Sequence, residues 1–119
     1  MPLQTGTWTA NVGGVPTHLN IIGVDANGRV NGYFGTSVSN AGAFWDEDSQ
    51  RLTLLNWPAN SPPQVFVGYL FTDPVNLTGV SGSVVFTLAG VVEDLPGAWG
   101  PAPTAKRSAF GWYAQIGVD

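Results

Sequence analysis

The sequence predicts an all-β fold: an eight-stranded antiparallel up-and-down barrel, formed as a single domain by residues 1–119. Three observations lead to this prediction. No part of the chain shows sustained helical periodicity. Short runs rich in Val, Ile, Thr and aromatic residues recur about every 10–15 residues, which is typical of all-β proteins. Turn-forming residues separate these runs, since the chain contains 16 Gly and 9 Pro.

The expected strands follow one another with mostly short connections. Asn27-Gly28 indicates a tight hairpin because Gly tolerates a positive φ, and residues 47–49 form another polar turn. A meander of this kind can close into a barrel, which removes both exposed sheet edges, and an open sandwich is the alternative. The strands are expected at 6–12, 16–25, 29–36, 41–46, 50–57, 64–72, 82–93 and 108–117.

Composition and charge exclude several classes of partner and location. The formal net charge is −4, and the four cationic side chains are scattered along the chain, so we expect no nucleic acid or anionic membrane as a partner. There is no cysteine, and therefore no disulfide or thiolate metal site. The beginning of the chain lacks a signal-peptide pattern, so a cytoplasmic location is expected unless a leader was removed.

The titratable residues do not form a recognisable catalytic or metal-binding motif. His18 is the single histidine, and no partners for a triad or a zinc site can be placed beside it. Asp46, Glu47 and Asp48 lack the ligand spacing of a calcium loop and read as a solvated turn. Glu93 and Asp94 are adjacent on a strand, so their side chains point apart. We therefore expect no enzyme activity, no metal and no cofactor.

Aromatic residues predict the composition of the barrel interior. If the strands alternate as expected, Trp8, Phe34, Trp57, Phe66 and Phe86 all face inward. Such a set fits either ordinary core packing or the stacking of a ligand ring, and the sequence leaves both interpretations open.

The last three expected strands carry apolar residues on both faces. A monomer would expose a large apolar patch there, and such patches mark interfaces. The sequence therefore predicts a homo-oligomer that associates through strands six to eight. The outward residues of this prediction are Val65, Val67, Tyr69, Phe71, Val85, Val91, Phe110, Trp112, Ala114 and Ile116.

The motif Gly6-Thr7-Trp8 on the first strand, the strand-turn-strand VDANGRVNGYF and the count of eight strands resemble the avidin and streptavidin family. The resemblance extends over most of the chain, and its motifs lie in the first 40 residues. It implies a non-catalytic barrel with a small-molecule site at one end, lined by polar groups and aromatic rings, and association through a similar region.

The resemblance also implies positions for the ligand-binding residues. Thr36 resembles a hydroxyl donor of the family, and Asn40 resembles the loop that closes over the ligand. Trp57 and Phe66 stand where the family has wall tryptophans. Trp99 resembles the tryptophan that a neighbouring subunit contributes. The full expected set is Trp8, Asn11, Phe34, Thr36, Asn40, Trp57, Phe66, Trp99 and Tyr113.

Several positions depart from the family pattern. Ala10, Gly14, Phe34 and Tyr113 stand where the family has polar contacts to biotin. Each buried group left without a hydrogen bond costs about 1–3 kcal/mol, so high-affinity biotin binding is not expected. Three alternatives to a small-molecule binder stay open: a sugar-binding lectin, a structural oligomer with a filled core, and a cofactor-free enzyme that uses Tyr113 or His18.

Overall fold

The computed structural model describes residues 1–35, 40–56, 63–72, 75–94 and 109–119, except for the side chains of residues 40 and 41. All regular elements among these residues are strands, and each begins and ends within two residues of its expected position. They are β1 (Gly6–Val12), β2 (Val15–Val24), β3 (Val30–Phe34), β4 (Asn40–Asp46), β5 (Arg51–Asn56), β6 (Gln64–Thr72), β7 (Val84–Asp94) and β8 (Ala109–Val118).

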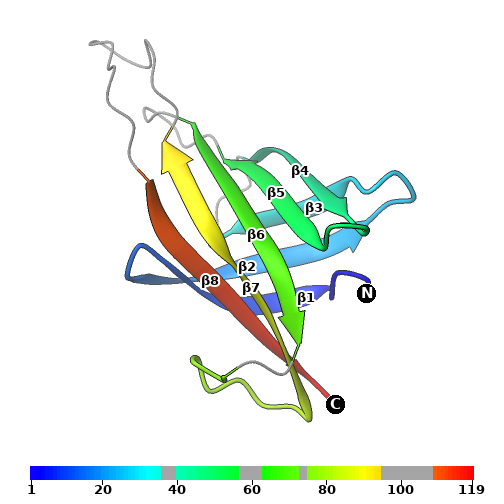
Figure 1. Ribbon diagram of the computed structural model, residues 1–119, viewed down its shortest axis with the longest axis vertical. Helices are drawn as coiled ribbons and strands as arrows, with labels where there is room; N and C mark the ends of the chain where they lie inside the picture. The colour runs from blue at the N-terminus through cyan, green and yellow to red at the C-terminus, as the bar shows by residue number, and fades with distance from the viewer. Residues whose placement is uncertain (36–39, 57–62, 73–74, 95–108) are drawn as a thin grey trace.

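The strands form one antiparallel sheet that curls into a nearly closed barrel (Figure 1). Their order is β3-β2-β1-β8-β7-β6-β5-β4, so only the pairing of β1 with β8 departs from sequence order. The terminal strands β3 and β4 meet at a single isolated bridge, Arg29 to Phe44. Next to it the Trp45 N–H donates to the Gly28 carbonyl at 2.7 Å. The prediction of an eight-stranded up-and-down barrel is confirmed, and the gap between β3 and β4 is called the seam below.

The barrel has two ends with different connections. At the end that we call the mouth, β1, β3, β5 and β7 end and the following strands begin. At the opposite end, the base, the turn from Asp25 to Arg29 joins β2 to β3. Oδ1 of Asp25 accepts from the backbone N–H groups of Asn27 and Arg29, both at 2.9 Å, and Gly28 has a φ of 83°. The hairpin predicted from Asn27-Gly28 is therefore confirmed.

Alternate side chains of every strand fill the middle of the barrel. The largest of the fully buried residues include Trp8, Leu19, Leu52 and Leu88, which come from four different strands. Their apolar surface is removed from water, which is the main favourable contribution to folding. Phe86, which was expected inside, packs against this core.

Gly68 makes room for the indole of Trp112 in this core. Gly68, Gly90 and Trp112 lie directly opposite one another on β6, β7 and β8. A Cβ at Gly68 would lie 2.5 Å from Cζ2 of Trp112, so the ring occupies the space that a side chain would need. The Trp112 indole N–H donates to the carbonyls of Val67 and Val91 at 3.2 and 3.1 Å.

The structure corrects the expected outer face of β8. Trp112 and Ala114 are buried in the core, and Phe110 and Ile116 pack against it. All four were expected on the outer face. Successive residues of a strand point to opposite sides of the sheet. Assigning one residue of β8 to the wrong face therefore reverses the faces of all its residues. The outer face of β8 instead carries Tyr113 and Gln115.

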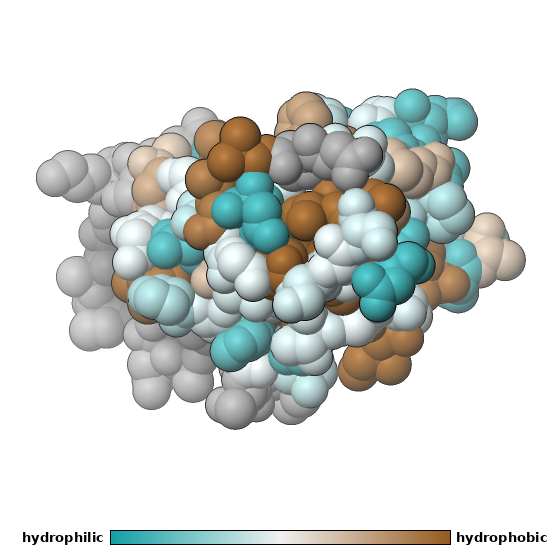
Figure 2. Space-filling view, turned by 90° about the horizontal axis from the view of Figure 1, so that it is seen from below, coloured by the Kyte–Doolittle hydropathy of each residue, from teal (hydrophilic) through white to brown (hydrophobic). Residues whose placement is uncertain are grey.

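Gln115 holds the connection between β6 and β7 against the outer face of the barrel. Its Oε1 accepts from the backbone N–H groups of Leu77 and Thr78, at 2.8 and 3.0 Å, and from the Thr78 hydroxyl at 3.1 Å. Its Nε2 donates to the Val75 carbonyl at 2.9 Å and to the Thr87 hydroxyl at 2.8 Å. This connection lies at the base of the barrel. Figure 2 views the molecule from below and shows polar and apolar residues side by side on that surface.

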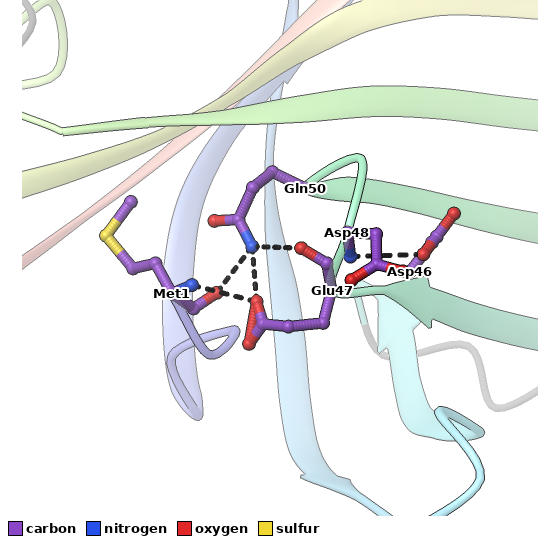
Figure 3. A network of polar contacts seen from close by, with 5 residues as sticks. All are labelled: Met1, Asp46, Glu47, Asp48 and Gln50. Atoms are coloured by element: carbon purple, nitrogen blue, oxygen red, sulfur yellow. Dashed lines mark hydrogen bonds and ion pairs between the residues drawn. The ribbon is translucent and has the colours of Figure 1, made fainter.

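The β4–β5 turn and the N-terminus form a polar network at the base (Figure 3). The N-terminal ammonium lies 2.9 Å from a carboxylate oxygen of Glu47 and lowers the pKa of that carboxyl. The Gln50 amide donates to the carbonyls of Met1 and Glu47 and to the Glu47 carboxylate. The three acidic residues thus lie in a solvated turn, as expected.

Within this turn, Asp46 is expected to titrate below its ordinary pKa of 3.8. The Ser49 hydroxyl donates to Oδ2 of Asp46 at 2.9 Å and favours its ionised form, and the Asp48 N–H contributes at 3.2 Å. The turn is therefore favoured above that ordinary pKa and weakened as pH falls through the lowered one. Titration of the carboxyl carbon by NMR measures this pKa, and Ser49→Ala should raise it. An unchanged pKa in that variant would contradict the assignment.

Candidate functional site

A chain of three polar side chains crosses the mouth on the inner side of β5, β6 and β7. Asn56, Gln64 and Asp94 lie directly opposite one another in the sheet. The Asn56 amide donates to Oε1 of Gln64 at 3.4 Å, and the Gln64 amide donates to Oδ1 of Asp94 at 3.0 Å. We call these residues the polar row. All are half-buried, so the row is partly accessible to a molecule at the mouth.

An aromatic cluster lies one layer deeper than the polar row. Phe66 follows Gln64 by two residues and therefore shares its face of β6. Its ring centroid lies 4.5 Å from that of Phe34 and 5.7 Å from that of Trp112, and the Phe34 and Trp112 centroids are 5.9 Å apart. Trp112 meets both phenyl rings nearly edge-on, an arrangement that aromatic pairs prefer.

An apolar pocket of about 400 Å³ opens at the same end of the barrel. Val12, Gly13, Val15, Thr17 and Phe110 line it, so it lies where the β1–β2 hairpin meets the start of β8. The mouth thus offers an apolar wall on β1, β2 and β8 and hydrogen-bonding groups on β5, β6 and β7. This combination is typical of sites for small organic molecules.

Three of the expected ligand-binding residues lie in the interior. Phe34 and Phe66 belong to the aromatic cluster and so lie directly beneath the polar row. Trp8 is fully buried, and its indole N–H donates to the Gln4 carbonyl at 3.1 Å. Trp8 is therefore a core residue, whereas the two phenylalanines form the floor of the mouth.

Two others point away from the interior. Asn11 and Tyr113 lie directly opposite each other on β1 and β8. Their chain neighbours Ala10, Trp112 and Ala114 are buried in the core, so both side chains face the outside of the barrel. Neither side chain therefore lines the interior of the barrel. The remaining expected residues Thr36, Trp57 and Trp99, and the side chain of Asn40, lie outside the described residues.

The described part of the chain contains no group of three or more His, Cys, Asp and Glu residues that could hold a metal ion. His18 is exposed on the outer face of β2, opposite Thr9. None of the described residues belongs to a helix that could span a membrane.

The polar row was not among the expected site residues. Local patterns place Asp94 only beside Glu93 at the end of a strand, and they give Asn56 and Gln64 no distinct role. The sequence contains one signal for the row: Asn56, Gln64 and Asp94 all lie at strand ends, and in a meander these ends meet at the same end of the sheet. Connecting them requires the register that places Asn56 opposite Gln64 and Gln64 opposite Asp94.

Comparison with known proteins gives no relative from which a function could be transferred. No protein-family model matches the chain, and no curated protein or solved structure is significantly similar to it.

Proposed function

We propose that this protein is a non-catalytic barrel, resembling the avidins, that binds a small molecule at its mouth. The observation that carries the proposal is the polar row, which lies one layer above the aromatic cluster. A half-buried row of hydrogen-bonding groups beside apolar walls suits a ligand with a ring and a polar edge.

The direction of the hydrogen bonds in the row indicates which polar groups the ligand carries. Asn56 donates to Gln64, and Gln64 donates to Asp94, so the chain of donors ends on a carboxylate. A carboxylate accepts more than one hydrogen bond. The matching ligand therefore presents N–H or O–H groups toward Asp94 and an apolar ring toward Phe34 and Phe66.

The packed middle of the barrel restricts such a ligand to the mouth. Trp8, Leu19, Leu88 and Val92 are fully buried, so the core beside and below the aromatic cluster is filled by side chains. A ligand held only at the mouth does not enter the packed core. We therefore expect weaker binding than in a deep enclosed pocket, and biotin itself should bind weakly or not at all.

Ligand-observed NMR with a library of ring compounds tests this proposal. The library includes amides, cyclic ureas, biotin and methyl glycosides, which also covers the lectin alternative. Compounds that bind should shift the side-chain amide resonances of Asn56 and Gln64. Gln64→Leu and Asp94→Asn should each weaken binding about tenfold or more, because a hydrogen bond to a charged group contributes about 1.5–3 kcal/mol.

The matched control is Thr53→Ala on the outer side of β5, which should leave binding unchanged. Equal binding to wild type and both mouth variants would contradict the proposal. The proposal would also be contradicted if no compound shifted the Asn56 and Gln64 resonances.

A second candidate function, a structural oligomer, is favoured by the outer face of β6 and β7. Val67 lies opposite Val91, and Tyr69 lies opposite Ala89. Together with Phe71 these residues form a continuous apolar strip that we call the outer patch. Tyr69, Phe71 and Val91 are 43%, 52% and 49% exposed in the single chain. Large exposed apolar patches mark interfaces, so we propose that copies of the chain associate through the outer patch.

The double variant Tyr69→Lys with Val91→Lys should dissociate this oligomer, because it places charges in the contact. Sedimentation velocity at micromolar concentration measures the change. Val15→Lys, at an exposed position of the mouth hairpin, serves as the control and should keep the wild-type mass. A wild-type protein that sediments as a monomer would refute the association.

A further inference from the structure

Within the described part of the chain, the seam leaves backbone groups of β3 without a strand partner. Alternate residues of an antiparallel strand turn their N–H and C=O groups toward the same neighbour. The Gly35 N–H donates to the His18 carbonyl at 2.7 Å, so Gly35 and Tyr33 face β2. Gly32 and Phe34 therefore turn their backbone groups toward the seam. No described strand pairs with this edge of β3 beyond the bridge at Arg29.

A groove of about 530 Å³ lies along the seam. Arg29, Val30 and Asn31 line it on the β3 side, and Gly42 and Ala43 line it on the β4 side. The bridge between Arg29 and Phe44 closes the seam toward the base. The groove end beside this bridge carries the cationic side chain of Arg29 and the carboxylate of Asp25.

Arg29 provides a group that can recognise a carboxylate. Its side chain is exposed and makes no hydrogen bond or ion pair to any other described residue. Asp25 lines the same groove, and its Oδ1 is already occupied by two backbone N–H groups of the turn. A guanidinium binds a carboxylate through parallel charge-assisted hydrogen bonds.

An apolar side chain lies next to this cation. Phe44 is directly opposite Arg29 in the bridge and is 56% exposed. An apolar residue that packs on this ring would remove exposed apolar surface from water. The groove end at the bridge therefore combines a cation with an apolar contact, beside an edge of β3 that no described strand pairs.

We propose that the seam binds the C-terminal end of an extended peptide by β-strand addition. The peptide runs antiparallel to β3 and pairs with the backbone groups of Gly32 and Phe34. Because β3 runs from the base to the mouth, an antiparallel strand ends beside Arg29. Its terminal carboxylate then binds Arg29, and its last side chain, which is apolar, packs on Phe44. The site shares only the backbone of Phe34 with the mouth, and it uses neither the polar row nor the phenyl ring, so it does not depend on the small-molecule proposal.

The probe is an N-acetylated hexapeptide of alternating Thr and Val that ends in Val with a free carboxylate. The same peptide with a C-terminal amide tests the contact to Arg29, and a version with alternate backbone N-methyl groups tests strand pairing. Fluorescence anisotropy of labelled peptides measures binding to the full chain. The free acid should bind about tenfold or more tightly than either modified peptide.

Arg29→Gln should reduce the affinity for the free acid to that for the amide, and it should leave binding of the amide unchanged. Arg51→Gln removes another cation from a different part of the barrel and should have no effect on either peptide. Equal affinity for the free acid and the amide would overturn the proposal. Tight binding of the N-methylated peptide would do the same.

Hydrogen exchange measured by NMR locates the contact. The amides of Gly32 and Phe34 should exchange fast in the free protein and slow down when the free-acid peptide is added. Slow exchange of both amides in the free monomer would show that the edge is already paired and would refute the proposal. Protection that depends on protein concentration and not on peptide would assign the seam to a second copy of the chain, which also refutes it.

Discussion

Replacing Trp112 with Ala is expected to destabilise the protein by about 3–5 kcal/mol, the usual cost of removing a large buried aromatic side chain. Trp112 is only 3% exposed, and its ring fills the space above Gly68. The substitution leaves a cavity that this glycine cannot fill. It also leaves the carbonyls of Val67 and Val91 without the indole donor. Denaturant unfolding followed by circular dichroism measures the loss.

Tyr69→Ala is the matched control, since Tyr69 is an exposed aromatic residue on the outer side of the same sheet. It should change the free energy of unfolding of the monomer by less than about 1 kcal/mol. A loss below that value for Trp112→Ala would contradict the buried position of the indole. This prediction replaces the expectation that Trp112 lies in an intersubunit contact, because a charge at this position should unfold the barrel itself.

The positions of the strands could be predicted from the sequence because local signals determine them. Strands β1 and β6 occupy the expected residues, 6–12 and 64–72. The turn between β2 and β3 follows from the conformational freedom of Gly28 and from the short side chain of Asp25, which accepts from the turn backbone. Strand alternation and turn residues are signals that extend over only a few positions, so they can be recognised in a single sequence.

The inner face of β8 could not be derived in the same way. The resemblance to the avidins places Tyr113 inside, and this choice turns Trp112 and Ala114 outward. The structure shows the opposite, because Trp112 is buried and its ring packs on Gly68. This contact joins residues that are more than forty positions apart in the sequence. Only the register of β6, β7 and β8 reveals that this glycine and this tryptophan are complementary.

The candidate site was predicted in part for the same reason. Phe34 and Phe66 face inward, as strand alternation indicates. The polar row depends on non-local pairing, since Gln64 is 30 residues from Asp94 along the chain. Asn11 and Tyr113 were placed by resemblance alone, and the alternation of β1 and β8 turns both outward.

Replacing Gln115 with Leu is the second change from which we expect a large effect. Gln115 has no exposed surface, and its amide group is bonded at both ends. Leu has a similar volume but can neither accept from Leu77 and Thr78 nor donate to Val75. Each buried group left without a hydrogen bond costs about 1–3 kcal/mol. The groups on the connection recover part of this cost by bonding to water. We therefore expect the free energy of unfolding to fall by about 2–4 kcal/mol.

Hydrogen exchange distinguishes local from global effects of this substitution. The amides of Leu77 and Thr78 should exchange much faster in Gln115→Leu, whereas those of the β1–β2 pair should follow the change in global stability only. Unchanged protection of Leu77 and Thr78 would show that Gln115 does not hold the connection. Asn76 provides a comparison within the same loop, because its side chain bonds only to Gly79 and Val80. Asn76→Ala should therefore have the smaller effect.

Gln115→Glu tests the direction of the hydrogen bonds rather than their number. One oxygen of the introduced carboxyl can still accept from Leu77 and Thr78, but the other replaces the donor to the Val75 carbonyl. Burial and the facing carbonyl favour the protonated form, so the folded-state pKa should rise above the unfolded value of about 4.3. The folded state then binds more protons than the unfolded state between these two pKa values. Relative to wild type, the variant should lose stability as pH rises through that window. Unfolding of both proteins across the same pH series measures the difference, and a difference that does not vary with pH would show that this side chain does not donate to Val75.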